Sequence, residues 1–428
     1  MFRKIKSIFS TELLQVFTFT GLSTLVKLVA SYVTVKVVAS VIGPGGIALI
    51  GQLQNFTAVF TTLGAGGINN GVVKYVSEYK EDQTLLQQYI RNGFKITVWF
   101  SVFFGLLLIL ASNDLSRWIL FEEKYSYVFI FFGISLLLLS LNNYFISILN
   151  GFKEFRKFVT LNIITSIAGL VFTVLLVLFY HLEGALIATV SYQSVVLFVT
   201  LFYLRKSSWF QYMILWGKWD MLIVKKYFSY SMMALVSAAT LPVSQLLIRG
   251  NIIKNLSIDS AGHWEGMNRI SALYLMFFTA SFSVYYLPRL SELKDNSLLR
   301  KEIVKVYKII TPLIVLSLIM IYLLRDLLIS FLFSKEFYPM IDLFLWQLIG
   351  DFFKIMSWIL AFVMVAKSMI KIYIITEIAF ATLFVGLSTA FINNLGLIGV
   401  TQAYCLNYFF YFVAMVFVFR NLLFRKSL

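Results

Sequence analysis

The stretch TGLSTLVKLVASYVTVKVVASVIGPGG, residues Thr20–Gly46, contains an apolar run long enough to cross a lipid bilayer, yet it includes two lysines. A membrane-spanning helix needs about 20 mostly apolar residues. If the span runs from about residue 17 to residue 41, a rise of ~1.5 Å per residue places Lys27 within a few ångströms of the bilayer midplane. A charge at that depth costs roughly 2.5–3.5 kcal/mol. The stretch therefore predicts a membrane span that contributes to a functional site.

A polar stripe follows one face of the same predicted helix. Helical periodicity places six polar residues on this face, namely Thr20, Ser23, Thr24, Lys27, Ser31 and Thr34. Lys36 lies on the opposite side and is close enough to a helix end to snorkel. Two interpretations remain open. Either Lys27 contacts a substrate, or both lysines reach the interface and the stripe packs against neighbouring helices.

The composition is that of an all-α polytopic membrane protein. The 428 residues are 60% hydrophobic and only 13% charged, with a mean hydropathy of +0.86, whereas soluble domains carry about 25% charged residues. The single cysteine, Cys405, excludes a disulfide framework and a cysteine-based metal site. The net charge of +16 is explained by membrane topology, so no nucleic-acid partner is expected.

Hydropathy predicts twelve transmembrane helices. The predicted spans are residues 15–41, 46–73, 94–112, 127–149, 159–180, 184–204, 228–253, 262–287, 303–324, 341–366, 371–391 and 397–419. Most of the 36 lysines and arginines fall in alternate connections when the N-terminus is placed inside. This bias predicts that both termini are cytoplasmic, because positive loops stay on that side.

The chain is predicted to consist of two six-helix lobes, residues 1–204 and 228–428. Asn113–Phe121 resembles Arg325–Phe333, and Tyr75–Lys80 resembles Arg289–Lys294, in the same order in each half. Matching loops in two halves with an even number of spans indicate parallel repeats, which are typical of transporters that bind substrate between the halves.

Residues 205–227 connect the two predicted lobes. Trp209, Met213 and Trp216 recur there at helical spacing among cationic residues. This pattern predicts an amphipathic linker in the membrane interface. A solvated linker is the alternative, and three tryptophans in the segment make it the weaker one.

Two pairs of opposite charges lie inside the predicted spans of the second half. Glu265 and Arg269 are four residues apart and can pair within one helix. Asp351 and Lys354 are three residues apart, on one face and near mid-depth, and can pair in the same way. Each pair is either a self-neutralising structural bridge or part of a functional site.

Cations inside the predicted spans outnumber the clear anions. A water-filled cavity that receives an anionic substrate would lower the free-energy cost of placing these cations in the membrane. We therefore predict substrate-binding residues Lys27, Lys36, Arg249, Arg269 and Lys354, and ion-coupling residues Asp351 and Glu265. No catalytic residue, metal site or cofactor is predicted. His181 and His263 lie at span ends without the carboxylate spacing of a zinc or nucleophile site, and the GAGGINNG run lacks a P-loop lysine.

Several motifs resemble the Wzx-type O-antigen flippases of the multidrug/oligosaccharidyl-lipid/polysaccharide (MOP) exporter superfamily, especially translocases of lipid-linked enterobacterial common antigen. The resemblance covers essentially the whole chain. It rests on Ser23–Lys27, Gly43–Gly45, Ala65–Tyr79, Thr279–Leu293, Arg325–Leu327, Leu332–Ser334 and Leu343–Lys354. The family tends to have neutral polar residues where this chain has Glu265 and Arg269, so these two charges are expected to reflect its particular glycan.

The resemblance implies a V-shaped MATE-like fold and a flippase in the bacterial inner membrane. It implies a substrate in which a sugar chain is linked to undecaprenyl pyrophosphate, and export to the periplasmic leaflet by alternating access in lipopolysaccharide or related polysaccharide biosynthesis. It also implies membrane lipid, a polysaccharide polymerase and a chain-length regulator as partners.

Two other functions are weighed against the flippase. A cation-coupled multidrug exporter of the same fold would need an anionic cavity, and the predicted cavity is cationic. A membrane glycan polymerase would be expected to have a large external loop, and no predicted outside loop has that size. The chain is therefore predicted to be a transporter and not an enzyme.

Overall fold

The computed structural model describes residues 11–211, 213, 215–293, 295–367 and 369–424, and these form helices and short connections without a strand. The chain divides into two compact units. Unit 1 comprises residues up to Val41 together with Leu53–Ala239, and unit 2 comprises Ile42–Gln52 together with the chain from Thr240 onward. The predicted lobe boundaries at residues 204 and 228 stay a prediction.

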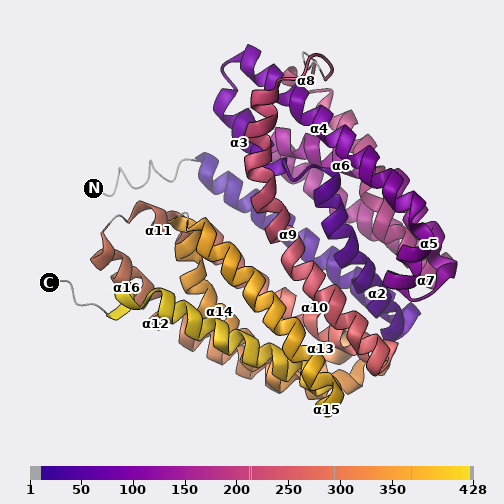
Figure 1. Ribbon diagram of the computed structural model, residues 1–428, viewed down its shortest axis with the longest axis vertical. Coiled ribbons are helices and arrows are strands. Elements are labelled where there is room, and N and C mark those ends of the chain that lie inside the picture. Colours follow the sequence, from indigo (N-terminus) through magenta and orange to yellow (C-terminus); the bar gives the residue numbers. More distant parts are fainter. Residues whose placement is uncertain (1–10, 212, 214, 294, 368, 425–428) are drawn as a thin grey trace. The chain divides into compact units, whose positions relative to one another are not determined.

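The prediction of an all-α protein with twelve spans is confirmed. Seven helices in the described part of the chain are long and apolar enough to cross a membrane. Three long helices are each broken at one residue and so supply two spans, namely α2 (Thr11–Gly64), α7 (Phe155–Leu204) and α15 (Ile370–Val418). The other four of the seven supply one span each, namely α4 (Gln83–Leu110), α6 (Ser126–Gly151), α12 (Asn296–Leu323) and α14 (Phe344–Ala366) (Figure 1). The helices α9 (Met221–Asn255) and α10 (Ile258–Ser281), which are less apolar, occupy the two remaining predicted spans, residues 228–253 and 262–287.

The breaks in the long helices lie at residues with left-handed backbone angles. Gly43 has φ 65° and Gly396 has φ 61°, a conformation that glycine adopts without a Cβ clash. Pro44 follows Gly43 and is suited to open the next helix, where its missing N–H has no partner to lose. His181 has φ 48°, which is strained for a residue with a Cβ, by roughly 1–2 kcal/mol.

The order of elements repeats along the chain, as the sequence motifs predict. A long helix, a short helical turn, a single span and a broken double span follow one another as α4 to α7 and again as α12 to α15. The shorter elements are α3 (Asn69–Tyr79), α5 (Ser112–Leu115), η1 (Ser116–Leu120), η2 (Glu123–Tyr125), η3 (Phe282–Tyr286), α11 (Leu287–Glu292), α13 (Arg325–Leu332), η4 (Lys335–Leu343) and α16 (Arg420–Phe424). The matched motifs Asn113–Phe121 and Arg325–Phe333 fall on α5 with η1 and on α13.

The connecting segment 205–227 packs on unit 1. Its only helix before α9 in the described residues is the four-residue α8 (Ser208–Gln211), so helical structure across the whole segment, as the tryptophan spacing suggests, is not found. Trp209 donates to Glu154 Oε1 at 2.6 Å and stacks on Phe152. Lys95 is buried and donates to the carbonyls of Gly217 and Lys218 at 3.0 and 2.9 Å. These tertiary contacts, rather than helix periodicity, determine the local structure. Its place in the membrane interface stays a prediction.

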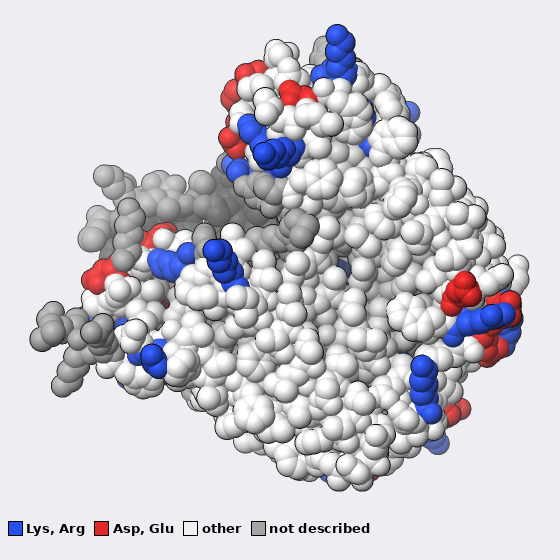
Figure 2. Space-filling view, viewed as in Figure 1, with Lys and Arg blue, Asp and Glu red and all other residues white. Residues whose placement is uncertain are grey.

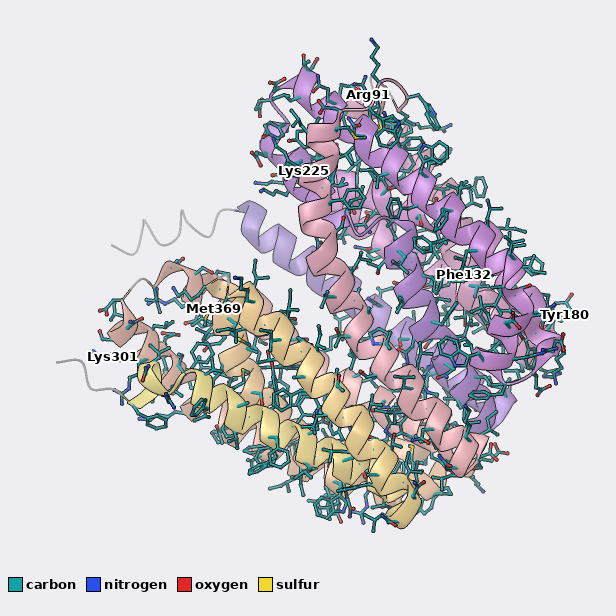
Figure 3. All side chains as sticks on the ribbon, viewed as in Figure 1. Arg91, Phe132, Tyr180, Lys225, Lys301 and Met369 are labelled. Atoms are coloured by element: carbon teal, nitrogen blue, oxygen red, sulfur yellow. The ribbon has the colours of Figure 1, made fainter. Side chains whose placement is uncertain are left out.

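Charged side chains lie at the ends of each unit, and the broad surface between those ends is uncharged in the view of Figure 2. Figure 3 places Arg91 and Lys225 at one end of unit 1 and Tyr180 at the opposite end. Within unit 2, Lys301 and Met369 share one end. This distribution is the one that a multi-pass membrane protein needs, because an uncharged band faces the lipid hydrocarbon.

Candidate functional site

Glu265 is shared by two arginines inside unit 2. Arg249 Nη2, from α9, donates to Glu265 Oε2, and Arg269 Nε donates to Glu265 Oε1 at 2.9 Å. The side chain of Arg249 is 0% exposed and that of Arg269 is 20% exposed. Gln52 Oε1 accepts from Arg249 Nη1 at 3.1 Å, and the Trp264 ring lies 5.4 Å from the guanidinium carbon. We name these five residues the arginine cluster.

The arginine cluster depends on close packing of α10 against residues 42–52. A Cβ at Gly51 would lie 2.7 Å from the Glu265 carboxyl carbon, and a Cβ at Gly262 would lie 2.0 Å from the Pro44 carbonyl oxygen. Only glycine leaves room at these two contacts. Because glycines at these two positions leave the facing surfaces without side chains, the two segments approach closely and Gln52 can reach Arg249.

Gly51→Ala is expected to displace Glu265 and to lower the thermal stability of the protein, because the added methyl group meets a carboxylate that both arginines hold in place. The expected cost is about 1–3 kcal/mol. The measurement is the melting temperature of purified protein in detergent. Gly386→Ala is the matched control, since a Cβ there meets no atom within 4 Å. Equal melting temperatures for both variants would contradict the packing argument.

Asp351, from α14, is 0% exposed and accepts hydrogen bonds from three hydroxyl groups. Ser271 Oγ donates to Oδ2 at 2.7 Å, Tyr274 OH donates to the same oxygen, and Tyr404 OH donates to Oδ1 at 2.6 Å. Gln347 extends the network by donating to Ser271 Oγ at 3.2 Å. We name these residues the aspartate network.

The predicted direct pairing of Asp351 with Lys354 is wrong. Among the described residues no salt bridge joins them, and Lys354 Nζ instead donates to Tyr404 OH at 3.1 Å. The Tyr404 hydroxyl thus accepts from Lys354 and donates to Asp351. The physical reason is that three hydroxyls from other helices already donate to the carboxylate, and the ammonium lies near aromatic rings.

Lys354 is surrounded by aromatic side chains. Its Nζ lies 4.9 Å from the Tyr408 ring centre and 5.4 Å from the ring centres of Trp358 and Tyr404. Aromatic faces attract a cation electrostatically, so the charge is accommodated without a direct carboxylate partner. The side chain is half-buried and remains available to a further anion.

A small cavity of about 60 Å³ is lined by Tyr408, one of these aromatic residues, and by Glu377. Its other polar lining residues include Thr240, Ser244 and Asn407. The site residues predicted from the sequence do not include Glu377. The signal that identifies it is a glutamate within the apolar run of α15.

The predicted site residues fall into two groups. Arg249, Arg269, Lys354, Asp351 and Glu265 all lie in unit 2, where α10 contributes to both the arginine cluster and the aspartate network. The other two, Lys27 and Lys36, lie on the first half of α2 in unit 1. Lys27 is exposed and Lys36 is half-buried.

The histidines and the cysteine give no metal centre in the described part of the chain. No group of three or more His, Cys, Asp or Glu side chains there is placed to bind a metal ion. His263 Nε2 contacts the Glu336 carbonyl oxygen at 2.9 Å, and His181 lies at the break in α7. Both positions fit structural roles.

Comparisons with known proteins identify the relatives of the chain. A family model described as polysaccharide biosynthesis protein matches residues 13–294. The chain is 30% identical over 393 residues to proteins named lipid III flippase from Escherichia coli and from Shigella flexneri. The match covers 92% of this chain and 94% of each relative. These relatives are flippases and not catalysts.

Solved structures show the fold. An inward-facing MATE family multidrug transporter of the MOP superfamily matches with a TM-score of 0.79 at 14% identity, covering 94% of this chain and 96% of that chain. The lipid II flippase MurJ in an inward closed conformation matches with a TM-score of 0.71 at 16% identity, covering 95% and 87%. The expected resemblance in fold to MOP superfamily transporters is therefore confirmed. The sequence matches show that the chain belongs to the polysaccharide biosynthesis protein family.

Proposed function

We propose that the protein is a flippase that moves a lipid-linked oligosaccharide across the bacterial inner membrane, from the cytoplasmic to the periplasmic leaflet. The proposed carrier is undecaprenyl pyrophosphate, and the proposed glycan is an O-antigen or enterobacterial common antigen repeat unit. The sequence relationship to lipid III flippases over nearly the whole chain supports this. The observation that carries the proposal is the arginine cluster, in which two guanidinium groups share one carboxylate inside a membrane-embedded unit.

The cations have different proposed roles toward the pyrophosphate. Arginine presents a planar array of donors that matches phosphate oxygens, and Arg269 is the arginine of the cluster that is 20% exposed. Lys354 offers a compact charge at the edge of its aromatic cage. Lys27 and Lys36 supply cations from unit 1. The lipid tail stays in the bilayer while alternating access carries the polar part across.

Ion coupling is proposed at Asp351 in preference to Glu265. The groups that contact Asp351 are hydroxyls, which can accept as well as donate, so they adapt when the carboxylate gains a proton. The groups that contact Glu265 are guanidinium donors with no acceptor capacity. Protonating Glu265 would therefore break hydrogen bonds with the arginines. Protonating Asp351 would only reorient the hydroxyls that contact it.

The multidrug exporter is the rival function, and the MATE structures share the fold. An organic cation needs an accessible carboxylate. In unit 2 the carboxylate of Glu265 is bridged by two arginines, and that of Asp351 accepts from three hydroxyls. Glu377 lines a cavity of only about 60 Å³, well below the ~300 Å³ or more of a pocket for a drug-sized molecule. The described charges of the site thus favour an anionic substrate. A polysaccharide polymerase and a chain-length regulator remain proposed partners.

Lys27→Ala is expected to abolish export while the protein still inserts and folds, because Lys27 is an exposed cation on the polar stripe of α2. Lys27→Arg should keep partial function, since the charge survives while shape and hydration change. The measurement is surface polysaccharide in cells that lack their own flippase, at equal membrane levels of each variant. Leu25→Ala, two residues away and 60% exposed, is the control and should export normally. Full export by Lys27→Ala would remove Lys27 from the site.

A further inference from the structure

A groove of about 1540 Å³ lies on unit 2, away from the arginine cluster. It is bounded by the first turns of α12, the end of α14, the start of α15 and the residues that follow α15. Figure 3 shows Lys301 and Met369 of this groove at the same end of the unit. The lysine and arginine distribution predicts that this end is cytoplasmic.

Five cationic residues line the groove, namely Arg300, Lys301, Lys305, Lys308 and Lys367. Lys301, Lys305 and Lys308 are exposed and share one face of α12, and within the described residues none of the three makes a salt bridge. Like charges four residues apart repel one another, so this arrangement has a cost that a bound anion would remove.

The carboxylate in the groove attracts Lys301, but among the described residues it makes no salt bridge with any of the three lysines. Asp295 is the N-cap of α12, and its oxygens accept from the Ser297 backbone N–H at 2.9 Å and from the Ser297 hydroxyl at 2.8 Å. Lys367 is also engaged, because its Nζ donates to the Leu293 carbonyl oxygen. Arg300 is half-buried, whereas Lys301, Lys305 and Lys308 are exposed, so these three lysines are the groups best placed to offer charge to a ligand.

The groove also has a substantial apolar lining, beside the polar residues Asn296, Ser297 and Asn421. Its other lining side chains include Leu299, Val304, Ile309, Val363, Val418 and Leu422. Val304 and Ile309 alternate with the lysines along α12, so an apolar surface begins beside the charges and continues toward the middle of the span. A soluble anion would gain nothing from this surface, whereas a lipid would bury its acyl chain there.

We propose that this groove binds an anionic phospholipid, with its phosphate between Lys301, Lys305 and Lys308 and its acyl chain along the apolar side chains. The occupant follows from charge complementarity at one end of the groove and hydrocarbon complementarity along the rest. The site is separate from the proposed flippase site, so phospholipid binding does not require the lipid-linked glycan.

The test is binding of short-chain phosphatidylglycerol to the purified full-length protein in neutral detergent, followed by native mass spectrometry. Each lysine beside an anionic lipid contributes roughly a factor of five in affinity, so changing Lys301, Lys305 and Lys308 together to glutamine is expected to lower affinity on the order of 100-fold at low salt. The three Lys→Arg changes should retain binding. Arg205, Lys206 and Lys218, changed together to glutamine, form the control, because these exposed cations lie outside the groove and should leave affinity unchanged.

A second comparison separates a phospholipid from a free phosphate. Val304→Ser with Leu422→Ser is expected to weaken phosphatidylglycerol binding several-fold and to leave the melting temperature near that of the wild type. Phosphatidylcholine with the same chains should bind weakly, and inorganic phosphate or glycerol phosphate should not compete at equal concentration. Competition by free phosphate, equal loss in the control variant, or full binding by the triple glutamine variant would each overturn the proposal.

Discussion

Glu265→Gln is expected to cause the largest loss of folded protein of any single change in the site. Arg249 is 0% exposed, and Glu265 is its carboxylate partner. Breaking a buried ion pair by removing one partner costs about 3–5 kcal/mol, a large part of the ~5–15 kcal/mol by which proteins are stable. The measurement is the amount of monodisperse protein after detergent extraction, together with its melting temperature.

Two further variants make the Glu265 prediction specific. The double change Glu265→Gln with Arg249→Met should recover much of the folded protein, because the fully buried guanidinium is removed together with its partner. Arg269 also loses its bond to Glu265 in this variant, but its side chain is 20% exposed and its charge is less costly. Glu292→Gln is the matched control, since Glu292 pairs with Arg289 at an exposed place where a salt bridge contributes little. A melting temperature of wild-type value for Glu265→Gln would show that the arginine cluster does not stabilise unit 2.

Asp351→Asn is expected to leave the protein folded but to remove the response of export to an imposed ion gradient. Asparagine still accepts a hydrogen bond through its oxygen, so the hydroxyls of Ser271, Tyr274 and Tyr404 keep part of their network. A group that cannot gain or lose a proton cannot couple ion movement to transport. The measurement is export per folded protein in vesicles, with and without the gradient.

The control for Asp351→Asn is Asp326→Asn, because Asp326 also accepts from a tyrosine hydroxyl but lies outside the network, paired with Tyr338 at an exposed place. It should keep its gradient response. Tyr404→Phe, which removes the hydroxyl between Asp351 and Lys354, should weaken the response without abolishing it. Full gradient dependence in Asp351→Asn would exclude Asp351 from coupling.

The sequence predicts local features well. The twelve spans follow from the length of apolar runs, because bilayer thickness fixes the helix length that every span needs. Glu265 and Arg269 pair as predicted, since four residues along one helix bring the side chains together. The breaks in α2 and α15 coincide with the glycines Gly43 and Gly396 that separate predicted spans.

Contacts between distant residues could not be predicted in the same way. Gln52 and Arg249 meet because Gly51 and Gly262 let two segments approach, and no sequence period encodes that approach. For Asp351 and Lys354 the spacing along the helix permits an ion pair that does not form. Hydroxyl groups from other helices donate to the Asp351 carboxylate instead. Local spacing limits which partners are possible, and tertiary packing selects among them.

The central claim is that this protein moves a lipid-linked oligosaccharide whose pyrophosphate is bound by cations of the site. The most direct measurement is the flipping rate of a defined undecaprenyl-pyrophosphate oligosaccharide in vesicles that contain the purified protein. We predict rapid flipping by the wild type, and a loss of roughly 10–100-fold for Arg269→Gln, the effect of removing a charge-assisted contact. Equal rates for the wild type and protein-free vesicles, or transport of an organic cation in place of the glycolipid, would contradict the account.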